Sequence, residues 1–256
     1  MQDLSIGILQ FKQIWLDKQA NFKHILTLLE GLPKLDLLIL PEMFHTGFSM
    51  QIEHADNWQD SDGLHFLLEL AREQGTAIYT SLMIQDQDSY FNRGVFVEPN
   101  GDIHCYNKRK AFGLGREDEF FTPGSQEVIV AYKDWNINLQ ICYDLRFPEL
   151  IRNRIKPTGQ PAYDILLYVA NWPEKRIAHW DALLKARAIE NQCYVAACNR
   201  LGTDGNDLFY NGHSQVIDMF GNYLLAPHEQ EGIFVVHLAK NSLSVGRKSL
   251  PFLKDA

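Results

Sequence analysis

Hydrophobic and polar residues follow two different periods along this chain. Where apolar residues alternate with polar ones, or where about four to eight apolar residues follow one another, the pattern predicts a strand. On these rules we expect strands at residues 4–10, 35–40, 76–84, 95–98, 103–106, 128–132, 137–141, 165–169, 194–197, 214–218, 223–226 and 233–238.

Apolar residues three and four positions apart predict helices instead. This period occurs in residues 22–29, 64–71 and 176–191. Gly31 and Gly75 are suited to end the first two of these helices, because glycine is favoured just past a helix terminus.

The order of these elements predicts the fold class. Strands alternate with helices, and the chain contains no linker, repeat or low-complexity segment. We therefore expect one α/β domain over residues 1–256, with two layers of strands and outer helices. Residues 239–256 are polar, and we expect an irregular C-terminal tail there.

Composition and charge exclude several classes of function. The 256 residues are 46% hydrophobic and 22% charged, as in ordinary soluble proteins. The formal net charge of -8 argues against a nucleic-acid partner, which requires a basic surface. The longest apolar runs are too short to cross a membrane, and the first residues do not resemble a signal peptide. We expect a cytoplasmic protein.

The four cysteines are Cys105, Cys142, Cys193 and Cys198. A chain of this size without a signal peptide does not need disulfides, and no Cys or His pair with the spacing of zinc ligands is accompanied by a second such pair. The sequence also contains no phosphate-binding loop and no dinucleotide fingerprint. We therefore expect neither a cofactor nor a bound metal.

Cys142 differs from the other cysteines in its position. It follows the predicted strand at residues 137–141, and Pro148 fits the first turn of a helix just beyond. At such a turn we expect an exposed thiol near the positive end of a helix dipole, which favours the thiolate. A nucleophile suits this place, although an arbitrary cysteine is more often a small buried hydrophobe.

Two other apolar strands end in polar groups. Glu42 follows residues 35–40, and Asn171-Trp172-Pro173 follows another buried strand. Lys108 comes directly after the second strand of a predicted hairpin. Because catalytic groups in α/β sheets gather beyond the carboxyl ends of strands, we expect these residues to share one crevice with Cys142.

Each of these residues alone also fits an ordinary structural role. Glu42 is suited to cap a turn, and Arg146 fits an exposed helix position. Lys108 lies in a run of three cations, which is typical of a solvated surface. Only the combination of the motifs favours a catalytic interpretation.

The combination resembles the nitrilase superfamily of carbon–nitrogen hydrolases, over nearly the whole chain. Four segments carry the resemblance: Leu40-Pro41-Glu42-Met43-Phe44, Tyr106-Asn107-Lys108-Arg109, the acidic segment from Glu117 to Gly124, and Cys142-Tyr143-Asp144-Leu145-Arg146-Phe147-Pro148-Glu149. The resemblance implies a single-domain, four-layer α-β-β-α sandwich that forms homodimers. The expected dimer contacts are residues 146–152 and 176–191.

The resemblance also implies the roles of the catalytic residues. Cys142 is the expected nucleophile and Glu42 the general base. Glu117 is the expected supporting carboxylate, although Glu119 is an alternative in the same acidic loop. An amide oxyanion needs hydrogen-bond donors, for which the Lys108 ammonium and the Tyr143 backbone N–H are candidates.

Within the superfamily, the segments Phe44-His45-Thr46-Gly47-Phe48 and Lys185-Ala186-Arg187-Ala188-Ile189-Glu190-Asn191 resemble the omega-amidase branch. Enzymes of this branch hydrolyse the terminal amide of 2-oxoglutaramate and 2-oxosuccinamate. Arg146 is placed to bind the carboxylate of such a substrate. We expect aromatic side chains to wall a small pocket around it: Phe44, Phe147 and Trp172.

Two alternatives remain open at this point. One is another small-amide, carbamoyl or deaminated-glutathione hydrolase of the same superfamily, and the other is a non-catalytic binding protein. The second would lack a catalytic group, and none is missing. Where relatives commonly have His-Leu-Phe, this chain has Lys110-Ala111-Phe112, so a second cation lies close to Lys108 in sequence.

Overall fold

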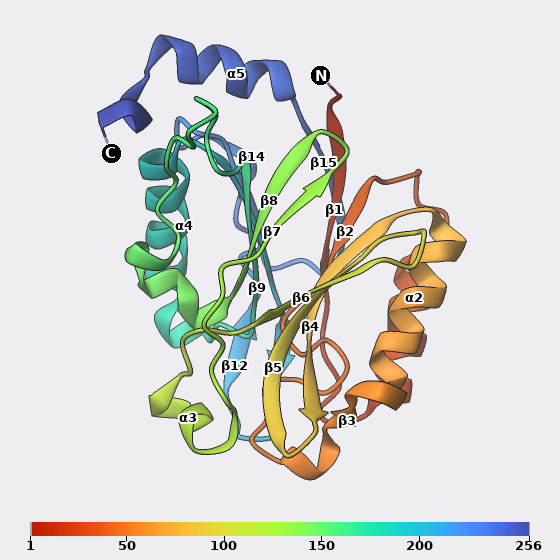
Figure 1. The fold of residues 1–256 in the computed structure, drawn as a ribbon. Helices are drawn as coiled ribbons and strands as arrows, with labels where there is room; N and C mark the ends of the chain where they lie inside the picture. Colours follow the sequence, from red (N-terminus) through yellow and green to blue (C-terminus); the bar gives the residue numbers. More distant parts are fainter. Residues whose placement is uncertain (1, 256) are drawn as a thin grey trace.

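The computed structural model describes residues 2–255, which form two main sheets with helices on their outer faces (Figure 1). The first sheet has the strand order β15 (Gly232–Leu238), β1 (Leu4–Gln10), β2 (Leu37–Ile39), β4 (Ala77–Asp86), β5 (Ser89–Val97), β6 (Ile103–Asn107), with β3 (Asp56–Asn57) paired to β4. The second has the order β14 (Tyr223–Leu225), β13 (Gln215–Ile217), β10 (Tyr194–Asn199), β9 (Ile165–Ala170), β8 (Trp135–Ile141), β7 (Ile129–Tyr132). A separate hairpin comprises β11 (Leu201–Thr203) and β12 (Phe209–Asn211).

The helices lie on the two outer faces. Those on the first sheet are α1 (Lys18–Leu28) and α2 (Asp62–Gln74), and α4 (Ile177–Asn191) covers the second. The remaining helices are α3 (Glu117–Phe120) and α5 (Lys240–Ser249). This arrangement confirms the predicted four-layer α-β-β-α sandwich.

Successive side chains along a strand point to opposite faces of its sheet, and this alternation explains how the layers pack. On β9, Ile165, Leu167 and Val169 face the first sheet, whereas Leu166 and Tyr168 face α4. A strand covered on both faces needs apolar residues at every position, which is why this segment reads as a continuous apolar run. The Tyr79 hydroxyl also donates a hydrogen bond across the sandwich to the Gln140 carbonyl, at 2.9 Å.

Parallel pairing sets the position of the polar strand ends. β1, β2 and β4 are parallel to one another, and so are β8, β9 and β10. β6 runs in the same direction as β4, because both are antiparallel to β5. The residues that follow β2, β6, β8 and β9 therefore leave their sheets at carboxyl ends, as the sequence predicted.

Two local predictions are wrong. Cys142 is followed by two short 3-10 turns, Cys142–Arg146 and Pro148–Leu150, and not by an α-helix. The predicted irregular tail at residues 239–256 contains helix α5 and a 3-10 turn at Phe252–Asp255. The sequence of α5 is polar because only Leu243 and Gly246 are buried in it.

Charged contacts hold α5 in place. Arg247 pairs with Asp164 at 2.7 Å and donates to the carbonyl oxygens of Tyr163 and Gln192, both at 2.8 Å. Lys240 pairs with the same carboxylate at 2.5 Å. Burial acts to raise the pKa of Asp164, but Lys240, the hydrogen bond from the Asn136 backbone N–H and the charge of Arg247 outweigh it and hold this pKa below its ordinary value.

No helix within residues 2–255 has the length and apolar character needed to span a membrane.

Replacing Arg247 with Ala removes three hydrogen bonds from the base of α5, so we expect the free energy of unfolding to fall by about 2 kcal/mol. Chemical denaturation checks this value. Lys248→Ala is the matched control, since Lys248 is an exposed neighbour on the same helix. Equal stability of the two variants would mean that the Arg247 contacts do not anchor the helix.

Candidate active site

Strand ends from both sheets bring Glu42, Lys108, Cys142 and Asn171 together. The Lys108 ammonium lies 3.0 Å from Glu42 Oε1 and 2.8 Å from Glu117 Oε2. Glu42, Lys108 and Glu117 are all buried. The structure thus joins four residues selected from the sequence, Glu42, Lys108, Glu117 and Cys142, in one cluster.

Lys108 is a buried cation held between two carboxylates. Burial acts to lower the pKa of Lys108, but the negative charges of Glu117 and Glu42 outweigh it and hold the pKa well above its ordinary value. The side chain therefore stays protonated at neutral pH, and it supplies a fixed positive charge to the cluster. A solvated position for Lys108 is excluded.

Glu117, and not Glu119, joins this cluster. Glu117 Oε2 also accepts a hydrogen bond from the Phe112 backbone N–H at 2.6 Å. Glu119 is exposed and pairs with Arg116 at 2.6 Å. The two carboxylates are only two residues apart, but the short helix α3 directs them to different sides.

Asn92 connects the two carboxylates and was missed in the sequence. Its side-chain Nδ2 donates to Glu42 Oε1 at 2.7 Å and to Glu117 Oε1 at 3.0 Å. Asn92 lies within β5 and is buried. The available signal was an asparagine within a strand whose other residues include Phe91, Val95 and Phe96, because a buried amide needs polar partners.

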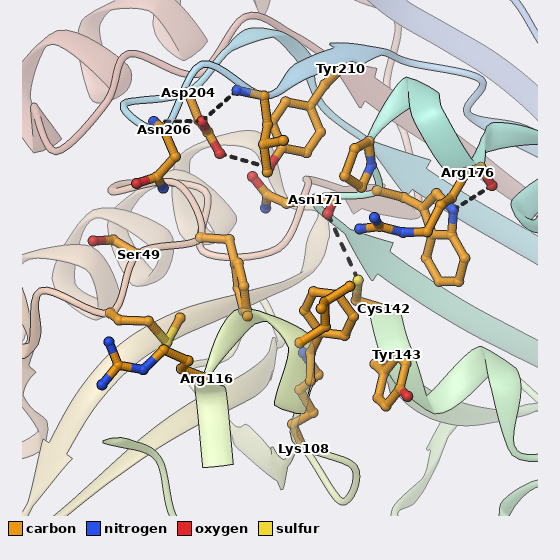
Figure 2. A pocket seen from close by; sticks show the side chains of 18 of the residues that line it. Ser49, Lys108, Arg116, Cys142, Tyr143, Asn171, Arg176, Asp204, Asn206 and Tyr210 are labelled. Carbon is orange, nitrogen blue, oxygen red and sulfur yellow. Dashed lines mark hydrogen bonds between the residues drawn. The ribbon is translucent and has the colours of Figure 1, made fainter. Parts of the chain in front are cut away.

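Cys142 begins its turn in a left-handed conformation, with φ of 44°. Its Sγ lies 4.0 Å from the Asn171 carbonyl oxygen (Figure 2). Burial and the nearby Glu42 carboxylate raise the pKa of the Cys142 thiol well above its ordinary value. Cys142 is half-buried and lines the pocket, so the expected exposure is met in part, whereas the neighbouring carboxylate favours the neutral thiol over the expected thiolate.

Asn171 links the two sheets at the site. Its backbone N–H donates to Glu42 Oε2 at 2.8 Å, and its side-chain Nδ2 donates to the Glu42 carbonyl at 2.6 Å. Behind it, the buried Arg200 guanidinium lies 3.5 Å from Asn171 Oδ1. Glu42, on the first sheet, is thus oriented by a residue of the second.

Asp144 fixes the turn that carries Cys142. Its carboxylate accepts hydrogen bonds from the backbone N–H groups of Ile141 and Lys110, both at 3.0 Å, and from the Tyr106 hydroxyl at 2.7 Å. Burial raises the pKa of Asp144 to about 6. The Lys110 ammonium lies 4.6 Å from the centre of the Phe147 ring, and Lys110 is not among the residues that line the pocket.

The site opens into a pocket of about 500 Å³ (Figure 2). Lys108, Cys142, Tyr143, Arg146 and Trp172 line it, as expected of a shared crevice. The aromatic residues that line it are Trp15, Phe48, Phe112, Tyr143, Trp172 and Tyr210.

Two of the predicted wall residues do not line this pocket. Phe44 is fully buried under helix α1, with its ring centre 5.9 Å from that of Phe22. Phe147 instead packs edge-on against Tyr143, at 5.2 Å between ring centres. Phe48 and Phe112 line the pocket instead.

Within residues 2–255, no three His, Cys, Asp or Glu side chains are grouped in a way that would hold a metal ion.

Comparison with known proteins identifies the family. A model of the family described as carbon–nitrogen hydrolase matches residues 5–248. The chain belongs to this family. The predicted membership in a superfamily of carbon–nitrogen hydrolases is therefore confirmed, and so is the prediction that the chain is an enzyme.

This chain matches individual members of the family over nearly its whole length. It is 39% identical to the omega-amidase YafV of Escherichia coli strain K12, and the match covers 100% of this chain and 98% of that protein. It is 33% identical to the 2-oxoglutaramate amidase of Bacillus subtilis, with 98% and 96% covered.

A solved structure supports the same assignment. XC1258 from Xanthomonas campestris is a CN-hydrolase superfamily protein with an arsenic adduct in its active site. It matches this carbon–nitrogen hydrolase with a TM-score of 0.97 and 39% identity, over 100% of this chain and 98% of that one.

Replacing Glu42 with Gln removes a negative charge beside the thiol, so we expect the pKa of Cys142 to fall. The rate of Cys142 alkylation by iodoacetamide, followed against pH by peptide mass, reports this pKa. The midpoint should move down by about one pH unit or more. Glu119→Gln is the control, because that carboxylate is exposed, and its midpoint should match the unmodified protein. An unshifted midpoint in Glu42→Gln would contradict the assigned cause.

Proposed function

We propose that this enzyme hydrolyses the terminal amide of small 2-oxo dicarboxylate amides, such as 2-oxoglutaramate and 2-oxosuccinamate, to the acid and ammonia. The observation that carries the proposal is the buried cluster of Glu42, Lys108, Glu117 and Cys142 at the base of a pocket that also contains Arg146. The omega-amidase and 2-oxoglutaramate amidase relatives support the choice of substrate.

In the first step, Glu42 takes the proton of the neutral Cys142 thiol as the sulfur attacks the amide carbon. The carbonyl oxygen becomes an oxyanion. Lys108 is permanently charged, and Tyr143 is the second residue of a helical turn, where backbone N–H groups lack partners within the turn. Both donate to the oxyanion, and losing one such donor typically costs about 3 kcal/mol of barrier.

In the second step, the tetrahedral intermediate collapses and the C–N bond breaks. Glu42 returns its proton to the leaving nitrogen, which departs as ammonia and leaves a thioester on Cys142. Glu42 then takes a proton from water as the water oxygen attacks the thioester carbon. The second tetrahedral intermediate collapses with cleavage of the C–S bond, and Glu42 returns the proton to the Cys142 sulfur, which releases the acid and restores the thiol. Glu117 keeps Lys108 charged and in place, and Asn92 keeps both carboxylates in register.

Arg146 supplies the recognition of the distal carboxylate. Its guanidinium lies 4.6 Å from the centre of the Trp172 ring, and it approaches His179 Nδ1 at 3.2 Å. Within residues 2–255, no carboxylate lies within 4.0 Å of it. A charged fork in a pocket that has no carboxylate partner is suited to a substrate carboxylate.

A larger linear amide, such as deaminated glutathione, is the second candidate substrate. The observation in its favour is the pocket volume of about 500 Å³, which leaves room beyond a five-carbon amide. The same catalytic residues would act on it.

Ammonia release from 2-oxoglutaramate, glutamine, a simple nitrile and an N-carbamoyl amino acid tests the proposal. We expect rapid turnover of the oxo-amide alone. Cys142→Ala should lower turnover by about 10³-fold or more while thermal unfolding stays cooperative. If only a different compound is turned over, the substrate assignment is wrong. If Cys142→Ala keeps full turnover, the assignment of Cys142 as the nucleophile is wrong.

Arg146→Ala should raise KM for carboxylate-bearing amides by about tenfold, because it removes a charged hydrogen-bonding fork. Steady-state kinetics on 2-oxoglutaramate and on a neutral amide such as butyramide measure the difference. KM for the neutral amide should stay within about twofold. A similar rise for both amides would contradict the recognition role.

Cytoplasmic location and the homodimer remain predictions. For the dimer, residues 146–152 and 176–191 stay the proposed contacts, and light scattering after gel filtration would measure the mass of the assembly.

A further inference from the structure

Three arginine side chains line the pocket, and they differ in their partners. They are Arg116, Arg146 and Arg176. Arg116 is two-thirds exposed and is held by Glu119 through two hydrogen bonds, at 3.0 and 2.6 Å. Within residues 2–255, the guanidinium of Arg176 makes neither an ion pair nor a hydrogen bond.

The pocket offers no acid that would neutralise the unpaired arginines. Among its described lining residues, Asp204 is the one carboxylate. Its oxygens already accept hydrogen bonds from the Asn206 and Leu208 backbone N–H groups, at 2.8 and 3.1 Å, and from the Tyr210 hydroxyl at 2.8 Å. Arg146 and Arg176 therefore carry positive charges that no carboxylate of the described pocket lining pairs with.

The position of Arg176 is fixed, although its guanidinium is free. Its carbonyl oxygen accepts a hydrogen bond from Trp172 Nε1 at 2.9 Å, and its guanidinium lies 5.3 Å from the centre of the Phe112 ring. Trp172 is also the ring over which the Arg146 guanidinium lies. In Figure 2, Arg176 is on the side of Cys142, and Arg116 is on the opposite side of the pocket.

We propose that Arg176 is a second specificity-determining residue, which binds the 2-oxo end of the substrate together with Arg146. This inference rests on the proposed function. A 2-oxo acid presents a carboxylate and an adjacent carbonyl oxygen, and both accept hydrogen bonds. Two guanidinium groups match these acceptors with planar N–H forks.

The same arrangement explains selection against amino-acid amides. Glutamine differs from 2-oxoglutaramate at one carbon, where an ammonium replaces the carbonyl oxygen. An ammonium has only donors, and it would face a second cation with no free carboxylate on the described pocket wall. Arg176 therefore favours the 2-oxo acid by attraction and disfavours the 2-amino acid by repulsion.

Binding to the inactive Cys142→Ala protein separates this inference from turnover. By isothermal titration calorimetry, adding Arg176→Gln should weaken the binding of 2-oxoglutaramate by about tenfold or more. Binding of butyramide should change by less than about twofold. Arg176→Lys should recover part of the loss, since it keeps the charge but not the fork. Arg116→Gln is the matched control, and it should bind like the parent.

In the active enzyme, Arg176→Gln should lower kcat/KM for 2-oxoglutaramate and raise the ratio of glutamine to oxo-amide turnover. If Arg176 had only a structural role, its replacement would lower kcat/KM by the same factor for every substrate and would leave this ratio unchanged. Equal weakening of butyramide and oxo-amide binding, or no weakening of either, would overturn the role of Arg176.

A failure of the proposed function gives a different result. If the unmodified enzyme does not hydrolyse the oxo-amide, yet Cys142→Ala binds it in an Arg176-dependent way, the recognition role stands and the proposed reaction does not.

Discussion

A lysine ammonium buried between two carboxylates is the constraint on which the site depends. Burying a charge away from water has a large desolvation cost unless opposite charges lie nearby. Lys108 therefore requires both Glu42 and Glu117 close by. Asn92 then holds the two acids at a fixed spacing. The cluster is held together because Lys108 and Asn92 donate hydrogen bonds to the carboxylates of Glu42 and Glu117. These contacts keep the Lys108 ammonium in a fixed position.

The sandwich makes this cluster possible by joining ends of strands from two sheets. Glu42 and Lys108 leave the first sheet, whereas Cys142 and Asn171 leave the second. Asn171 crosses the boundary, since it donates to Glu42 with both its backbone and its side chain. Misalignment of the two sheets would therefore separate the proposed base from the thiol, so the packing of the inner core and the geometry of the site are coupled.

The sequence predicts the parts of the site that are set by backbone direction. Glu42, Lys108 and Cys142 were identifiable because apolar strands end immediately before or near them and carboxyl ends of strands gather. Side-chain direction after such an end was not predictable: Met43 and Cys142 both have φ of 44°, Phe44 is buried, and Phe147 packs against Tyr143. Helix α5 escaped prediction because only Leu243 and Gly246 are buried in it, so few apolar positions mark it, and because Arg247 and Lys240 pair with the distant Asp164.

The left-handed backbone of Cys142 also bears on how the protein loses activity. A residue other than glycine in this conformation costs roughly 1–2 kcal/mol, and Met43 beside Glu42 carries the same strain. The backbone preference of Cys142 and Met43 for negative φ thus opposes these two turns. Surrounding contacts, such as those of Asp144 and Asn171, maintain them. We therefore expect these turns to relax on heating before the sheets separate, so that activity is lost while the circular dichroism spectrum is still intact.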